Sequence, residues 1–473
     1  MEVEVPGGSE AAAADTGSEA SFKVSQVDIV EEEVDESHLE NAEAMFEHLA
    51  RLPFQVFILS EFGRPIFVNT GNEVEMCSLF ALICAFVDRC RLWGDNLLTM
   101  TSQDKYIQFL HKSPLIFCIV SKYPEQLDDQ LEVLFEQICS ILSKSQLENV
   151  YKKKGDNYDL RKLLRGTDRL VESSISSWRG SPINLVDSSI SAIPMNPSDR
   201  EFLSSTMATS MGTAKLDGAL TMATSMGTAK LDGALFGIMI AHRQIAAIVR
   251  FKKYVIHPRD LNILINLVSD KSLQTDSQNW VPICLPRFND TGFFYAYISY
   301  PWKEQDIPAC LVLLSVKRDH FDGLKEVRQS IVTKLENNSK FFTNFSQAVR
   351  QPNLYQITQI GTNSESLWSF LYLNHSSRQV CMSASKIPLI SRLERWTTRC
   401  EMRRASAIST RHPHLRTLFV RGTKHCLFVW VTDLFSLYCI FGPFVTATVA
   451  FQVVEKLLKS LKSHEQRYFI INT

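Results

Sequence analysis

The sequence lacks the short patterns that mark most enzymes and metal proteins. Its 473 residues contain no Gly-x-Gly-x-x-Gly fingerprint, P-loop, Gly-x-Ser-x-Gly elbow or His-Glu-x-x-His pair. Phosphate cradles, serine nucleophiles and helical zinc sites depend on these spacings. His257-Pro258-Arg259-Asp260 faintly resembles a kinase catalytic loop, but no Asp-Phe-Gly accompanies it, and a helix start with proline in first position explains it better. We therefore expect no catalytic residue, no metal and no cofactor.

Charge and cysteine usage exclude further classes. The 50 Lys and Arg residues balance 51 Asp and Glu residues, and a net charge of −1 argues against a nucleic-acid binder driven by overall charge. The eleven cysteines include no Cys-x-x-Cys pair. Eight lie in apolar runs: Cys77, Cys84, Cys118, Cys139, Cys284, Cys310, Cys426 and Cys439. This usage indicates buried free thiols in a reducing compartment and disfavours a disulfide framework, a zinc site or a thiol-dependent enzyme.

The first 50 residues differ in composition from the rest of the chain. They are rich in acidic residues, hold Lys23 as their single Lys or Arg, and show no apolar core of a signal peptide. We expect residues 1–50 to be a disordered acidic tail in a cytosolic protein. Such a tail is either a solvated leader or a regulatory, partner-docking segment.

A hairpin followed by a helix with almost no charge between Glu75 and Asp88 organises what comes next. The strands are predicted over 54–61 and 65–69, around the Phe62-Gly63-Arg64 turn, and the helix over 73–91. This helix is apolar on all sides, so it must be covered on two of them. One cover is its own sheet, and the other is either a later helix or another polypeptide. The candidate partner contacts are Leu79, Leu82, Ile83 and Phe86.

Three more strands and a closing helix complete a ββαβββα unit, and this order recurs twice. The units are predicted over 51–178, 235–345 and 346–473. The fold class is therefore α/β, with three such units in tandem and antiparallel or mixed sheets flanked by helices. Residues 179–234 read as a linker because periodicity is lost and Ser, Pro and Asn accumulate.

Two stretches of the chain carry alternative readings. Residues 206–220 and 221–235 are identical in sequence. Two copies are too few to form a solenoid, so a recent duplication or a gene-model artefact explains them. Residues 434–454 carry no formal charge over about the length of a membrane span. Gly442-Pro443 interrupts that run, so a strand, turn and helix are favoured over a transmembrane helix.

Several long motifs resemble one family, the Mon/SAND vacuolar fusion proteins, whose fold is three longin domains. The resemblance covers about residues 51–473 and rests on these motifs, in the family's order: Phe57–Ile66, Asn157–Leu164, His257–Leu261, Trp280–Asn289, Gly292–Tyr300 and the end of the chain. Two features depart from the family pattern. They are the duplication and the arginine-rich segment 391–411, where the family tends to be acidic.

The resemblance implies a function. It implies a subunit of a heterodimeric guanine nucleotide exchange factor that pairs with a Ccz-type longin subunit and activates a late-endosomal Rab GTPase of the Rab-seven class. Such a protein has no covalent chemistry of its own and is recruited peripherally from the cytoplasm to endosome, vacuole or lysosome membranes, where it drives endosome maturation, vacuole fusion and autophagy. The alternative is a longin-type scaffold or adaptor without exchange activity.

The candidate contacts follow from this reading. For the GTPase they are Asn69, Asn72, Glu73 and Glu75, at the hairpin end and the helix start, although acidic residues there also suit a helix dipole. For an anionic, phosphoinositide-bearing membrane they are Arg399, Arg403 and Arg404, which could equally be a solvated helix face.

Overall fold

The computed structural model contains one compact unit, residues 51–473, apart from residues 1–50. It describes residues 52–471 except for these positions: 53, 72, 74–75, 103–104, 123–126, 155–159, 165–167, 181–188, 213–233, 251–253, 276–277, 351–365, 384–400, 403, 410 and 413. The predicted acidic tail and most of the duplicated stretch lie outside the described residues.

The first sheet contains five antiparallel strands in the order β2-β1-β5-β4-β3. The strands are β1 (Phe54–Ser60), β2 (Pro65–Val68), β3 (Thr99–Ser102), β4 (Lys105–Lys112) and β5 (Leu115–Ser121). β1 and β5 are buried along nearly their whole length, as expected of central strands that are apolar on both faces. The predicted hairpin is therefore present, with β5 on the other side of β1.

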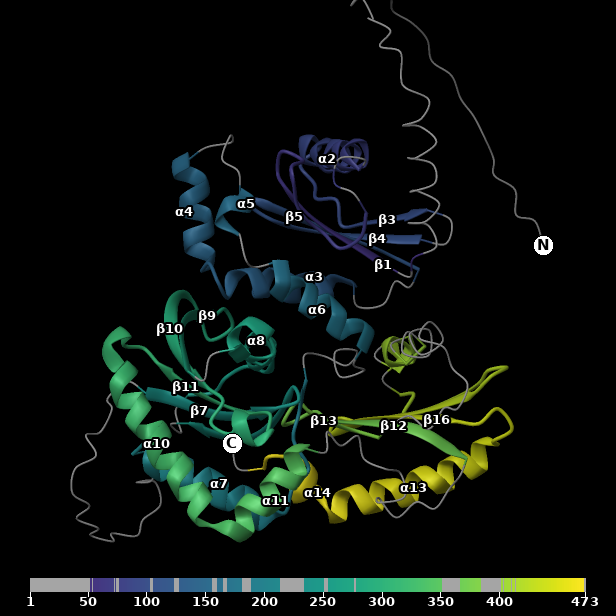
Figure 1. The fold of residues 1–473 in the computed structure, drawn as a ribbon. Helices are drawn as coiled ribbons and strands as arrows, with labels where there is room; N and C mark the ends of the chain where they lie inside the picture. The colour runs from purple at the N-terminus through teal and green to yellow at the C-terminus, as the bar shows by residue number, and fades with distance from the viewer. Residues whose placement is uncertain are drawn as a thin grey trace, which may run out of the picture. The chain divides into compact units, whose positions relative to one another are not determined.

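Helices cover both faces of this sheet (Figure 1). α2 (Cys77–Leu92) packs on the face that includes Phe57, and its Phe80 ring contacts the Phe57 ring at 5.6 Å. α3 (Leu127–Cys139) and α6 (Asp168–Gly180) pack on the face that includes Val56 and Ile58. α4 (Lys144–Lys154) and α5 (Leu160–Leu163) connect them. Alternate side chains of β1 thus enter two separate cores.

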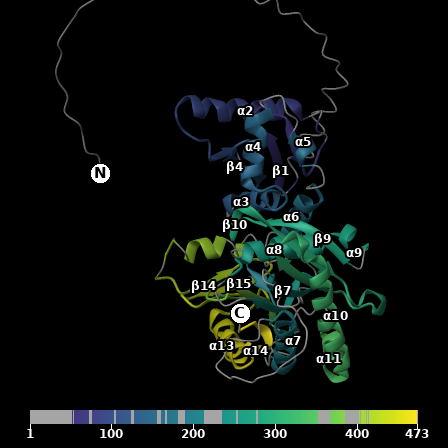
Figure 2. The same cartoon turned by 90° about the vertical axis from the view of Figure 1, so that its left-hand side faces the viewer.

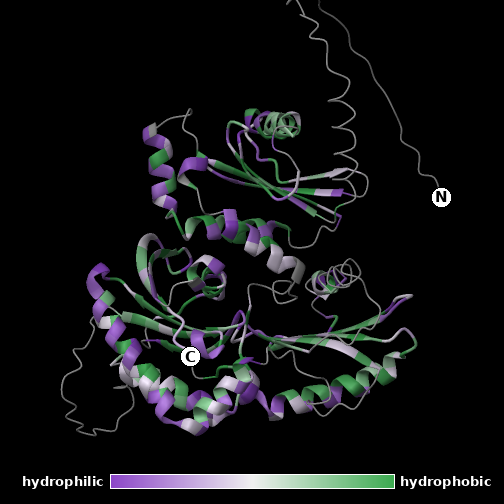
Figure 3. Ribbon diagram, in the orientation of Figure 1, coloured by the Kyte–Doolittle hydropathy of each residue, from purple (hydrophilic) through white to green (hydrophobic). Residues whose placement is uncertain are grey.

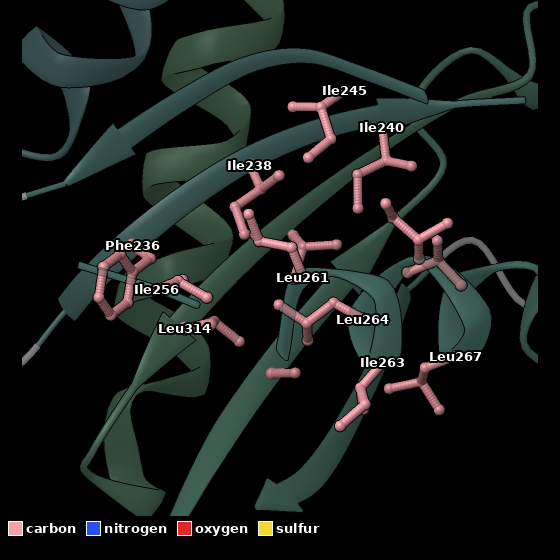
Figure 4. Packing of buried hydrophobic residues seen from close by; sticks show 14 of the residues in the cluster. Phe236, Ile238, Ile240, Ile245, Ile256, Leu261, Ile263, Leu264, Leu267 and Leu314 are labelled. Carbon is pink, nitrogen blue, oxygen red and sulfur yellow. The ribbon is translucent and has the colours of Figure 1, made fainter. Parts of the chain in front are cut away.

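The second sheet repeats the order as β8-β7-β11-β10-β9. Its strands are β7 (Ala234–Ala241), β8 (Gln244–Arg250), β9 (Gln278–Leu285), β10 (Asn289–Ser299) and β11 (Ala309–Ser315). α8 (Pro258–Val268) covers one face, where Leu261 and Leu264 lie against Ile238 and Ile240 (Figure 4). α10 (Phe321–Asn337) and α11 (Ser339–Arg350) cover the other, and α9 (Lys271–Thr275) follows α8.

The third sheet has the same order extended by one strand, β14-β15-β16-β12-β13-β6. Its own strands are β12 (Leu367–Asn374), β13 (Gln379–Met382), β14 (Thr417–Arg421), β15 (Cys426–Val431) and β16 (Phe435–Phe441). α13 (Ala447–Ser463) packs on one face and α14 (Glu465–Tyr468) follows. The uncharged stretch 434–454 thus forms a strand, a turn and part of a helix. No described helix meets the length and hydropathy of a membrane span.

The segment expected to be a linker, 179–234, is partly folded. Its β6 (Ile190–Ser191) and α7 (Pro197–Ser210) are ordered, and α7 buries Leu203 and Met207 in the second core. Asn196-Pro197 gives α7 a proline in its first turn. Sequence periodicity missed α7 because its buried residues are interspersed with Ser and Thr.

β6 joins the second and third sheets at their edges. It pairs in parallel with β13, and the adjacent Ala192 forms a bridge with Ile245 of β8. The end of the chain docks beside it, because the Gln379 amide donates to the Ile470 carbonyl at 2.9 Å and accepts from the Ile470 amide at 2.8 Å. The side chain of Ile470 belongs to the second core, whereas Phe469 belongs to the third.

We predict that Gln379→Ala lowers the free energy of unfolding by about 2 kcal/mol, because two buried backbone groups of Ile470 lose their partner. Urea or thermal unfolding of the full chain measures this change. The matched control is Gln452→Ala on the exposed side of α13, which should change stability by less than about 0.5 kcal/mol. Equal effects of the two substitutions would show that the Gln379 amide does not hold the chain end.

Candidate protein-binding surface of the first domain

The helix α2 presents two apolar faces, of which its own domain covers one. Phe80, Ile83, Cys84 and Val87 are buried against the sheet. On the outward side Leu82 is 52% exposed and Phe86 43%, and Leu79 is half-buried. The predicted partner contact Ile83 lies on the inward side instead and is only 7% exposed. Figure 3 shows the hydrophobic residues along α2.

The outward stripe continues past the end of the helix. Leu82, Phe86 and Trp93 follow each other at spacings of four and seven residues, which places them on one helical face. Trp93 is 70% exposed and its neighbour Leu92 is 78% exposed. Arg89 lies over the Trp93 ring at 5.1 Å from its centroid. We call Leu82, Phe86, Leu92 and Trp93 the outer face of α2. A contiguous exposed apolar surface of this kind is typical of a protein-binding site.

A half-buried carboxylate, Glu61, fixes the end of α2 to the hairpin. Glu61 accepts a hydrogen bond from Tyr151 at 3.2 Å and forms ion pairs with Arg91 at 3.3 Å and with His111 at 2.8 Å. Arg91 and His111 are also in close contact. The hydrogen bond from His111 is the largest cause that keeps the pKa of Glu61 below its usual value, and the charges of His111 and Arg91 add to it. Glu61 therefore ties α2, β4 and α4 to the β1–β2 turn.

The polar residues proposed for GTPase contact have structural partners. Asn69 accepts from the backbone amide of Val56 at 2.8 Å, so it closes the hairpin. Glu73 forms an ion pair with Arg161 at 2.7 Å, and both side chains remain about two-fifths exposed. Because α2 begins at Cys77 and has no acidic residue in its first turn, the helix-dipole explanation for Glu73 does not apply. Asn72 and Glu75 lie outside the described residues.

The remaining predicted contacts lie in the third domain. Arg404 is exposed, whereas Arg399 and Arg403 lie outside the described residues. Of the cysteines expected to be buried, Cys77 is exposed. Burial raises the pKa of the Cys84 thiol to about 11, which keeps it protonated and unreactive. Within the described part of the chain, no three His, Cys, Asp or Glu side chains are grouped as metal ligands would be.

Two arginines of the second domain hold helix α3 of the first, a joint that the sequence reading did not predict. Arg259 forms ion pairs with Asp129 at 2.8 Å and with Glu136 at 3.2 Å. Arg287 reaches the same Glu136 oxygen at 2.5 Å. Glu136 is buried, and breaking such a pair strands a charge at a cost of about 3–5 kcal/mol. Both arginines come from motifs quoted above for the family resemblance.

A polar cluster continues the joint inwards. The Asn266 amide donates to Gln137 at 2.9 Å and to the Leu170 carbonyl at 2.9 Å. The backbone amide of Cys284 donates to the Ser140 carbonyl at 2.7 Å. These hydrogen bonds join α8 and β9 to α3 and α6, so the joint fixes one orientation of the first domain on the second.

Asp260, next to Arg259 in the sequence, has no counter-ion of its own among the described residues. It is fully buried and accepts from the backbone amide of Arg287 at 3.2 Å, and no described residue donates a hydrogen bond to its second oxygen. Burial raises the pKa of Asp260 from 3.8 to about 6. Its neighbour His257 caps α8 by accepting from the Arg259 amide, and Pro258 is the first helical residue, as predicted.

Comparisons with known proteins match almost the whole described chain. Profiles described as the first, second and third longin domains of FUZ, MON1 and HPS1 match residues 54–173, 232–333 and 366–465 respectively. Protein SAND of Takifugu rubripes is 30% identical over 423 residues, which cover 88% of this chain and 76% of that protein. The prediction of three longin domains is confirmed.

Two further relatives carry the name vacuolar fusion protein. Vacuolar fusion protein MON1 of Yarrowia lipolytica is 28% identical over 435 residues, covering 88% of this chain and 74% of that protein. Vacuolar fusion protein MON1 homolog A of Homo sapiens is 28% identical over 421 residues, which are 88% of this chain but 60% of that protein.

We predict that Asp260→Asn stabilises the protein at pH 7.5 by about 1–2 kcal/mol and has no stabilising effect at pH 4. The raised pKa means that the folded state binds the proton more tightly, so stability falls as pH rises from about 4 to about 6 and stays lower above it. The gain is smaller than the roughly 3 kcal/mol of a two-unit shift because the amide oxygen of asparagine accepts from the Arg287 backbone amide less strongly than a carboxylate does. Thermal unfolding at several pH values measures it.

The control for this experiment is Asp322→Asn, an exposed acid in the first turn of α10. It should lose a few tenths of a kcal/mol at pH 7.5, the cost of removing a charge from a helix start. A loss of stability at pH 7.5 in Asp260→Asn would contradict the prediction and show that the carboxylate is needed charged.

Proposed function

Because the chain belongs to the MON1/SAND family of three-longin vacuolar fusion proteins, we propose that it is one subunit of a guanine nucleotide exchange factor. The second subunit is a Ccz-type longin protein, and the substrate is a late-endosomal Rab GTPase. The complex then acts in endosome maturation and fusion with the vacuole or lysosome, and serves autophagy through the same step.

The outer face of α2 is the observation that carries this proposal. Leu82, Phe86, Leu92 and Trp93 are each more than two-fifths exposed, although all four are large apolar side chains on the outward side or at the C-terminal end of α2. Each would gain about 1–2 kcal/mol on transfer from water into a protein interface. A second longin domain that brings its equivalent helix would bury this stripe, so the active species is the heterodimer.

Exchange of this kind needs no covalent chemistry in the chain. A protein that binds the GTPase in a conformation with a deformed nucleotide and magnesium site lowers nucleotide affinity by differential binding alone. The proposed contacts with that conformation of the GTPase are Asn69, Asn72, Glu73 and Glu75. Of these, Glu73 keeps an exposed carboxylate while Arg161 orients it.

Membrane recruitment is proposed for the basic part of the third domain. Arg404 is exposed on a helical stretch, and Arg399 and Arg403 neighbour it in the sequence. Each basic residue near an anionic surface contributes about 1 kcal/mol of attraction. These charges suit peripheral binding to phosphoinositide-bearing endosomal membranes.

We predict that the chain accelerates release of a fluorescent GDP analogue from the Rab only together with its Ccz-type partner. Leu82→Asp/Phe86→Asp should abolish both pairing and acceleration, because two charges cannot be buried in the interface without about 3 kcal/mol or more of cost each. The double variant should still fold, since both side chains already face solvent. Size-exclusion chromatography and nucleotide release measure the two effects.

One control variant and two contrary outcomes make this experiment decisive. Glu455→Lys, on the exposed side of α13 in another domain, should leave pairing and release unchanged. Pairing without any acceleration would favour the scaffold or adaptor function over exchange. Unimpaired pairing of the Leu82→Asp/Phe86→Asp variant would place the interface elsewhere.

We also predict that Arg399→Ala/Arg403→Ala/Arg404→Ala reduces flotation with liposomes that contain a phosphoinositide by about tenfold at low salt. Neutral liposomes should bind the unchanged chain and the variant equally weakly. Undiminished flotation of the variant would refute the lipid role of these arginines.

A further inference from the structure

Nearly every sheet edge in the described part of the chain is protected against a further strand, and β14 is the exception. β2 and β3 are only four residues long, β9 contains Pro282, β13 is covered by β6, and β8 is met by Ala192. Short strands, prolines and covering segments are the usual means of blunting an edge. β14 is five residues long, contains no proline and is covered by no segment that the structure describes, and it lies at the outer edge of the third sheet (Figure 2).

The backbone of β14 offers hydrogen-bonding groups on its free side. The Arg416 carbonyl accepts a hydrogen bond from the Val431 amide, and the Gly422 amide donates to the His425 carbonyl. In this register, the even-numbered residues of β14 form the hydrogen bonds to β15. Because bonding alternates along an antiparallel strand, the amides and carbonyls of Thr417, Phe419 and Arg421 point outwards. Another extended chain could bond to these groups.

The side chains of β14 favour an apolar strand. Leu418, Phe419 and Val420 follow each other without a charge, and Val420 is 44% exposed. Leu418 and Phe419 each pack only partly, on opposite faces of the sheet. A strand added beside β14 would cover both faces at once, with alternate side chains on each.

The charges around this edge are positive. Arg416 and Arg421 stand at its two ends, Arg411 and Arg404 lie close in sequence, and all four are exposed. None of the four forms an ion pair with a described carboxylate. The nearby acid Glu401 is engaged by His425 at 2.7 Å. Arg416 and Arg421 lie about 17 Å apart along the strand, the length of five residues.

From these observations we propose that β14 is a docking site for an acidic, extended peptide segment of a partner protein, which adds to the third sheet as an extra strand. Main-chain hydrogen bonds to the outward groups of β14 supply affinity, and alternating apolar residues cover Leu418, Phe419 and Val420. Acidic residues near both ends of the peptide pair with Arg416 and Arg421. This site lies in a different domain from the outer face of α2.

The probe is a fluorescein-labelled synthetic peptide, Asp-Glu-Val-Thr-Val-Ile-Glu-Asp, titrated with the full chain and followed by fluorescence anisotropy. Arg416→Glu/Arg421→Glu should weaken binding about tenfold or more, because both end charges become repulsive. Thr417→Pro should also weaken it about tenfold, because it removes an outward amide without touching the ladder to β15. Raising the salt from about 0.05 M to about 0.3 M should weaken binding to the unchanged chain.

Matched controls separate this site from general charge effects. Thr417→Ala keeps the amide, and Arg318→Glu/Lys325→Glu reverses two exposed charges of the second domain, so both should bind the peptide within about twofold of the unchanged chain. A peptide with lysine in place of each acidic residue should not bind. Thermal unfolding of each variant confirms that it is folded.

Three outcomes would overturn the proposal. In the first, the acidic peptide does not bind the unchanged chain. In the second, neither Thr417→Pro nor Arg416→Glu/Arg421→Glu changes the binding of the peptide. In the third, the unchanged chain floats with anionic vesicles but does not bind the peptide, and Arg416→Glu/Arg421→Glu abolishes that flotation. The last outcome would assign this edge to a lipid surface.

Discussion

The architecture depends on one constraint, that the central strands are apolar on both faces. β1 is buried at every position, and Phe57 faces one helical layer while Val56 and Ile58 face the other. Each sheet therefore needs a cover on both sides. In the first domain α2 provides the second cover, but it is itself apolar all round. Covering the sheet thus leaves an apolar stripe facing solvent, and this stripe is the surface on which the proposed pairing rests.

The three domains are held together by polar contacts as well as by apolar ones. Glu136 receives two arginines from the second domain, and Asn266 bonds to two elements of the first. β6 then joins the second and third sheets at their edges. Charge pairs and amide networks demand particular partners, so they fix orientation where apolar packing alone would tolerate sliding. A rigid frame of this kind suits a protein that acts by holding another protein in one conformation.

Much of the fold was predictable, since hydrophobic periodicity reports local burial. The first hairpin, predicted over 54–61 and 65–69, lies at Phe54–Ser60 and Pro65–Val68, and the same strand order recurs in all three domains as predicted. The main errors were the predicted start of the first helix and the prediction that residues 179–234 form only a linker. Glu73 was assigned to a helix that begins four residues later, and α7 was missed because Ser and Thr dilute its pattern.

The candidate site was predictable only in part. The surplus apolar surface of α2 follows from composition alone, but which residues face outward depends on the helix rotation against the sheet. Leu82 and Phe86 are exposed and Ile83 is not. The joint at Glu136 could not be anticipated, because its members are more than a hundred residues apart and no local pattern links them.

The position of β6 has a consequence for how the chain is made. Ile190 leaves the ribosome about 190 residues before Gln379, its strand-pairing partner in β13. The side chain of Gln379 can form its hydrogen bonds to Ile470 only after a further stretch of about 90 residues has been made. At roughly 5–20 residues per second, the segment is without its sheet neighbour for roughly 10–40 s. The second domain can form most of its core in that interval, but Ile470, which belongs to that core, and the border with the third domain follow only after the segment around Ile470 has been synthesised. Chaperones would therefore meet a second domain that is largely folded while its border with the third domain is still unpaired.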